Sequence, residues 1–106
     1  MIKAETVFVP LTVVMECEWV LRSFYKLTRI EISSALDRLT DVENVLFEQV
    51  DGVRWALQRL LHGADFADMV HIVQAKAAGA ASFVTFDEGL EAEAGNSPPL
   101  VVERPN

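Results

Sequence analysis

The sequence predicts an α/β layered domain, and three observations support this prediction. Short β-branched and aromatic runs alternate with longer segments of helical periodicity along the chain. Capping residues precede several helical segments, and glycines follow two of them. The 106 residues are 51% hydrophobic and 24% charged, which suits a globular protein with a modest core. We therefore expect residues 1–106 to form a single domain.

Each element is predicted from a local signal. Strands are expected where β-branched or aromatic residues cluster between turn formers: Thr6–Val9 (ended by Pro10), Asn44–Phe47, Ser82–Phe86 and, as an edge strand, Leu100–Glu103. Helices are expected at about 11–27, 29–39, 51–61 and 65–78. Thr28 and Glu31 form a capping-box pattern at the second helix. Asp51 and Asp65 are the expected caps of the third and fourth helices.

Composition narrows the class of protein. The formal net charge is −7, from 16 acidic and 9 basic residues, so a surface that binds nucleic acid mainly through phosphate contacts is not expected. Either nucleic acid is not the partner, or some acids bind a metal that meets the phosphates. The apolar run from Val7 to Val14 is too short to span a bilayer, and no secretory signal is recognisable. Cys17 is the single cysteine, so a reducing, cytoplasmic location is predicted.

The acidic residues of the first helix are predicted to lie on opposite faces. Glu18, Arg22 and Lys26 recur every four residues and are expected to form one solvated stripe. Glu16 lies about 200° around the helix from Glu18 and is expected to face the apolar side. A carboxylate there requires protonation, an ionic partner or a metal. A partly exposed acid at the helix flank, or one paired with an arginine, is the alternative.

Three further acids stand where functional carboxylates are common. Asp65 and Asp68 occupy the N-cap and first turn of the fourth helix, and helix capping alone explains Asp65. Asp87 directly follows the strand SFVTF, at the strand end where ligand sites of parallel sheets occur. A turn-forming role is the alternative for Asp87. Together with Glu16, these residues suggest a site for Mg²⁺, a hard cation that prefers oxygen ligands.

Other kinds of site find less support. The sequence has no Cys/His spacing for zinc, no phosphate-binding glycine loop and no nucleophile elbow. His62 and His71 are interpreted as surface or packing residues. The acids flanking Cys17 would raise a thiol pKa, which argues against a nucleophilic role. A phosphatase of the haloacid dehalogenase type is disfavoured because no Asp-x-Asp ends a first strand.

Two long runs of the sequence resemble bacterial PIN-domain toxins of the VapC type. They are FVPLTVVMECEWVLRSFYKLTRIEI and GADFADMVHIVQAKAAGAASFVTFDEGL, and the likeness covers nearly the whole chain. The resemblance implies a three-layer fold, in which a parallel sheet is flanked by helices. It also implies a ribonuclease that depends on Mg²⁺ or Mn²⁺, a homodimer, and a cognate antitoxin whose C-terminal segment blocks the site. By position, Glu16, Asp68 and Asp87 are the expected catalytic and metal-binding residues, and Asp65 is an auxiliary metal-binding acid.

The sequence departs from that family at its start. Members open with a strand ending in an Asp-x-Asn-like motif and a helix, whereas here MIKAE leads directly into what resembles the second strand. We expect a domain without the family's first strand and helix, and therefore without one metal ligand. Two functions follow as hypotheses: a ribonuclease toxin, or a catalytically inactive homologue that binds an antitoxin or another PIN subunit.

Overall fold

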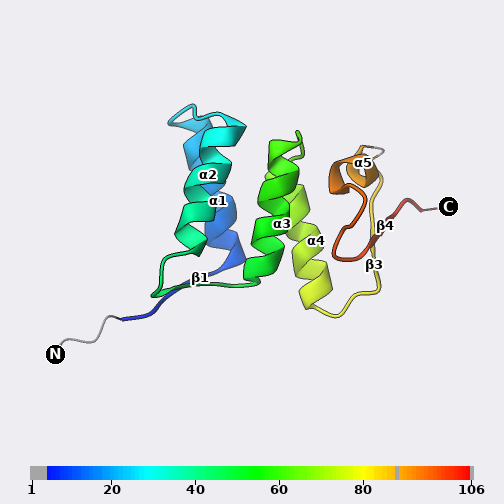
Figure 1. The fold of residues 1–106 in the computed structure, drawn as a ribbon. Helices are drawn as coiled ribbons and strands as arrows, with labels where there is room; N and C mark the ends of the chain where they lie inside the picture. Colours follow the sequence, from blue (N-terminus) through cyan, green and yellow to red (C-terminus); the bar gives the residue numbers. More distant parts are fainter. Residues whose placement is uncertain (1–4, 88, 106) are drawn as a thin grey trace.

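The computed structural model describes residues 5–87 and 89–105, which contain five helices and four short strands (Figure 1). In chain order they are β1 (Val7–Val9), α1 (Leu11–Ser23), α2 (Arg29–Thr40), β2 (Val45–Phe47), α3 (Val50–Leu61), α4 (Phe66–Ala77), β3 (Ser82–Val84), α5 (Leu90–Ala94) and β4 (Val101–Glu103). The predicted α/β class is confirmed. Residues 1–4, which include most of the MIKAE segment, lie outside the described residues.

All the described strand pairing is parallel, as expected for strands separated by helices. β1 pairs with β2, with Val7 opposite Val45, and β3 pairs with β4, with Ser82 opposite Val101. Within the described residues these are two separate two-stranded sheets. The helices α3 and α4 lie between the two pairs in Figure 1.

The core is centred on the contact between α3 and α4. Val53 and Leu57 of α3 are buried, as are Met69 and Ile72 of α4. Gly52 makes the close approach possible, because a Cβ atom at this position would overlap the side chain of Val73. Burying each large apolar side chain contributes about 1.5–3 kcal/mol relative to leaving it exposed. The position of α4 is therefore set mainly by apolar packing.

The predicted orientation of α1 is wrong. Glu18 is buried, with 4% of its surface exposed, together with Leu11 and Val14 on the same face, whereas Glu16 is exposed. The apolar neighbours of Glu16 do not lie in the core, since Trp19 is itself half-exposed. Glu18 is neutralised by Arg22, whose Nε donates to Glu18 Oε2 at 2.8 Å.

The local signals at the other helix ends vary in accuracy. The capping box of α2 is confirmed: Glu31 N donates to Thr28 Oγ1, and Thr28 N donates to the Glu31 side chain. Asp65 caps α4 as predicted. Asp51 does not cap α3, because the helix begins earlier and its N-cap is Gln49, in a left-handed conformation.

Other parts of the secondary structure also differ from the prediction. The first helix ends at Ser23 instead of about Leu27, β3 ends two residues before Phe86, and the short helix α5 was not expected. In the part of the chain that the structure describes, no helix has both the length and the apolarity that crossing a membrane requires.

Replacing Arg22 tests the buried ion pair of α1. Arg22→Met leaves the Glu18 carboxylate buried without its cation, and we expect the free energy of unfolding to fall by about 2–3 kcal/mol. Urea denaturation at pH 7 measures the change. The double variant Glu18→Gln/Arg22→Met should recover part of the loss, because an amide costs less to bury than an unpaired charge. Equal stability of Arg22→Met and the unaltered protein would contradict this account.

Candidate metal centre

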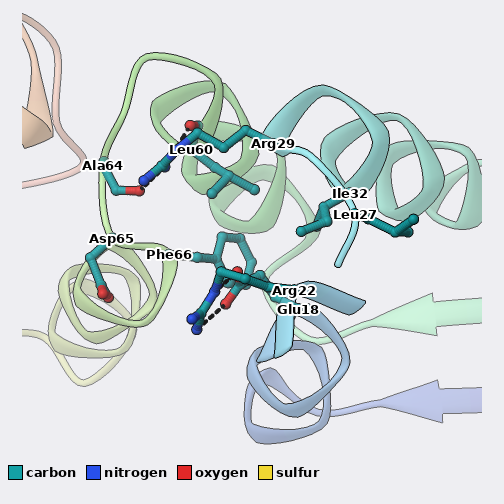
Figure 2. Close-up of a pocket in the computed structure, with 9 residues that line it drawn as sticks. All are labelled: Glu18, Arg22, Leu27, Arg29, Ile32, Leu60, Ala64, Asp65 and Phe66. Carbon is teal, nitrogen blue, oxygen red and sulfur yellow. Dashed lines mark hydrogen bonds and ion pairs between the residues drawn. The ribbon is translucent and has the colours of Figure 1, made fainter. Parts of the chain in front are cut away.

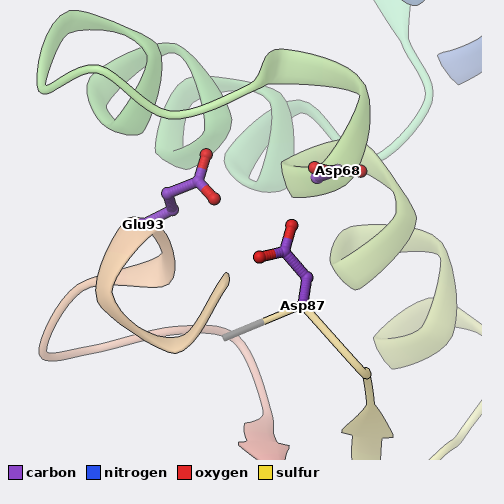
Figure 3. Close-up of side chains that lie close together, drawn as sticks. All are labelled: Asp68, Asp87 and Glu93. Atoms are coloured by element: carbon purple, nitrogen blue, oxygen red, sulfur yellow. The ribbon is translucent and has the colours of Figure 1, made fainter. Parts of the chain in front are cut away.

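Three carboxylates from separate segments meet at one end of α4. Asp68, Asp87 and Glu93 each offer an oxygen, and these oxygens all lie within 4.8 Å of one another. Figure 3 shows the three side chains directed into the same space from α4, from the segment after β3, and from α5. We call this group the carboxylate cluster.

Asp68 is held by the first turn of α4. The Asp65 side chain accepts a hydrogen bond from Asp68 N at 3.1 Å, which fixes the start of the helix. The neighbouring Met69 is fully buried, so the core determines how α4 is rotated about its axis. This rotation leaves the half-buried Asp68 directed toward the cluster.

Asp87 is positioned by a tight turn after β3. Asp87 N donates to Thr85 Oγ1 at 3.0 Å, and Gly89 N donates to Asp87 Oδ1 at 2.8 Å. The turn-forming role considered as an alternative for Asp87 is therefore confirmed. The same turn orients the carboxylate toward Asp68, so the structural role does not exclude a functional one.

Glu93 is the member of the cluster that sequence reasoning missed. Leu90 and Ala94 bury one side of α5, and Glu93 lies beside them with its Oε1 accepting from Asp65 N at 2.9 Å. The available signal was the segment LEAEA, whose apolar residues four apart predict a one-sided helical turn. Nothing local in this segment indicates that α5 packs next to Asp87.

The cluster concentrates negative charge. Burial raises the pKa of Asp68, and the negative charges of Asp65, Glu93 and Asp87 raise it further, while His71 acts in the opposite direction. The hydrogen bonds that the described residues donate to these carboxylates come from the backbone amides of Gly89 and Asp65. Three negatively charged carboxylate oxygens within 4.8 Å of one another fit the ligand preference of a hard divalent cation such as Mg²⁺ or Mn²⁺.

The other two predicted site residues lie outside the cluster. Asp65 is exposed, and its side chain is occupied as the helix cap. Glu16 is exposed on α1 and lines an open cavity of about 380 Å³, which also includes Glu18 and Ala67. The structure thus brings together Asp68 and Asp87 of the predicted set, and it adds Glu93.

A second polar region nearby has balanced charges. A cavity of about 140 Å³ is lined by Glu18 and Arg22, by Asp65, and by Arg29, which donates hydrogen bonds to Leu60 O at 3.0 Å and Ala64 O at 2.7 Å (Figure 2). The hydrogen bond and charge of Glu18 raise the pKa of Arg22, and Asp65 adds to this effect. Because Glu18 is already paired with Arg22 and the Asp65 side chain caps α4, this cavity is a poorer cation site than the carboxylate cluster.

Comparison with known families agrees with this fold. The sequence model of the PIN domain matches residues 1–95. The chain belongs to the PIN-domain family. Family membership indicates a protein of nuclease type, and PIN domains typically depend on divalent metal ions. The resemblance expected from the sequence is thus confirmed at the level of the PIN domain. No curated protein matches the chain, and no solved structure does.

Because the pKa of Asp68 is raised, we expect its carboxylate to lower the stability of the folded protein in metal-free buffer, by an amount that depends on pH. An acid whose pKa is higher in the folded state destabilises the protein as pH rises above its ordinary value of 3.8 and the group ionises. We therefore expect the Asp68→Asn variant to be more stable than the unaltered protein at pH 7 in EDTA. The gain should shrink as pH falls toward 3.8.

Urea midpoints at pH 7 and at pH 4 measure this difference. Asp37→Asn is the matched control, because Asp37 is an exposed acid on α2. A stability gain that is equal at the two pH values, or equal in both variants, would contradict the assigned cause.

Proposed function

We propose that this PIN domain is a metal-dependent ribonuclease and the toxin of a toxin–antitoxin system. The observation that carries the proposal is the convergence of Asp68 and Asp87 at one carboxylate cluster in a chain of this family. RNA phosphodiester bonds are the proposed substrate, and Mg²⁺ is the proposed cofactor, with Mn²⁺ as a substitute.

Asp68 and Asp87 are the proposed metal-binding residues. When bound, the cation supplies Lewis-acid stabilisation of phosphoryl oxygens and lowers the pKa of a coordinated water. Asp68 presents its carboxylate from the rigid first turn of α4, and Asp87 presents its own from the turn closed by Gly89 N. Asp65 keeps the first turn of α4 in place as its cap.

The acidic composition agrees with this assignment. With a net charge of −7, the chain offers few cations for direct phosphate contacts. A divalent ion held by Asp68 and Asp87 would supply positive charge for binding a phosphate. The metal-binding role predicted for Glu16 remains a proposal, and so does the auxiliary role of Asp65. Of the two acids on this part of α1, Glu18 is the buried one.

A homodimer, a cognate antitoxin and a cytoplasmic location are parts of the same proposal. An exposed apolar surface at the end of α1 supports a protein partner: Phe24 is 70% exposed, and Tyr25 and Ile30 are similarly exposed. Trp19 packs edge-to-face against Phe24, with ring centroids 5.6 Å apart. Aromatic side chains of this kind often dominate the energy of protein interfaces.

The alternative is a catalytically inactive PIN homologue that binds an antitoxin or another PIN subunit. The exposed strands favour it, since Phe8 of β1, Leu46 of β2 and Val84 of β3 all lie more than half open to solvent. Short strand pairs with open edges can accept a strand from another chain.

Cleavage of a fluorescently labelled single-stranded RNA tests the leading proposal. Activity should require Mg²⁺ or Mn²⁺, and Asp68→Asn or Asp87→Asn should reduce it by about 100-fold or more, because each removes a charge from the metal centre. Asp37→Asn should retain full activity.

Cleavage that persists in EDTA, or in both cluster variants, would contradict the proposal. The inactive alternative predicts that no preparation of the unaltered protein cleaves RNA at any metal concentration.

A further inference from the structure

We propose that Glu93 is a third ligand of this metal centre, supplied by the short helix α5. The inference rests on the proposed function, since it concerns the cation that Asp68 and Asp87 are proposed to bind. It adds a residue from a separate helix, so the site is complete only when α5 is packed in its place.

The two oxygens of Glu93 have different surroundings. Oε1 accepts from Asp65 N at 2.9 Å, beside the cap of α4. Oε2 lies on the side of Gly89, where an added Cβ atom would be 3.6 Å from Glu93 Oε2 and 3.3 Å from Asp87 Oδ1. The Glu93 carboxylate is therefore held in place by the hydrogen bond from Asp65 N to Oε1, and Oε2 is left to coordinate a cation between Glu93 and Asp87.

Contacts with α3 hold Glu93 in this place. The Glu93 carbonyl oxygen accepts a hydrogen bond from Arg59 Nε at 2.6 Å. Gly95 leaves room for that guanidinium, because a Cβ at Gly95 would lie 2.8 Å from Arg59 Cζ. Since α5 has only five residues, it depends on such contacts and on its buried Leu90 for its position. The ligand is thus preorganised by packing that precedes metal binding.

Anchoring of α5 does not explain why residue 93 is charged. The oxygen of an amide would accept the same hydrogen bond from Asp65 N, without adding a negative charge next to Asp68 and Asp87. Glu93 adds a third carboxylate whose oxygen lies within 4.8 Å of those of Asp68 and Asp87, so the three negative charges repel one another when no cation is present. A divalent cation turns this repulsion into attraction for all three carboxylates.

Titration calorimetry with Mn²⁺ separates the two roles of Glu93. Glu93→Gln keeps the hydrogen-bond acceptor and removes the charge, and we expect it to raise the Kd for Mn²⁺ by about 10-fold or more. Glu91→Gln is the matched control, because Glu91 lies on the same helix and pairs with Arg104 at 3.4 Å, away from the cluster. Its Kd should stay within about twofold of that of the unaltered protein, which shows that net charge alone is not responsible.

Thermal unfolding in EDTA supplies the second readout. Glu93→Gln should unfold at the same temperature as the unaltered protein or at a higher one, and it should gain less from added Mn²⁺. A large loss of stability in EDTA would show that the residue serves only to anchor α5 and would overturn the inference.

The outcomes distinguish this inference from the proposed function. If the unaltered protein binds Mn²⁺ and Asp68→Asn weakens binding while Glu93→Gln does not, Glu93 is not a ligand and the proposed function stands. If the unaltered protein binds no Mn²⁺, both proposals fail.

Discussion

The packing of α3 against α4 is the constraint on which the arrangement of the acids depends. Gly52 lets the two helices approach at Val73, and the buried side chains around this contact fix how each helix is rotated. That rotation directs Asp68 of α4 toward the cluster and Arg59 of α3 toward α5. The carboxylates repel one another, so the apolar packing of the helices has to offset this electrostatic repulsion.

The carboxylates near α4 differ in how their negative charge is neutralised. Glu18 is buried and paired with Arg22, which satisfies it within the chain. Asp87 and Glu93 each accept one hydrogen bond from a backbone amide, and the oxygens of all three carboxylates lie within 4.8 Å of one another. An external cation is the partner that would neutralise them. This contrast favours the carboxylate cluster at α4 and α5 as the candidate metal centre, and the exposed Glu16 does not belong to that cluster.

Most of the fold followed from local signals, whereas the site followed from them only in part. Capping at Thr28 and Asp65 depends on residues three apart, and both caps were predictable. The burial of Glu18 was not predictable, because α1 carries apolar residues on more faces than the one that packs against the core. Glu93 was missed because its place depends on Arg59, 34 residues earlier in the chain. Strand ends and helix starts located Asp87 and Asp68 without such long-range information.

The most direct test of the metal centre is anomalous diffraction from crystals of the unaltered PIN domain soaked in Mn²⁺. The account predicts one strong anomalous peak between α4, α5 and the turn after β3, within coordination distance of carboxylate oxygens from Asp68, Asp87 and Glu93. Absence of a peak at the cluster in well-soaked crystals, or a peak at Glu16 and Glu18 instead, would contradict it.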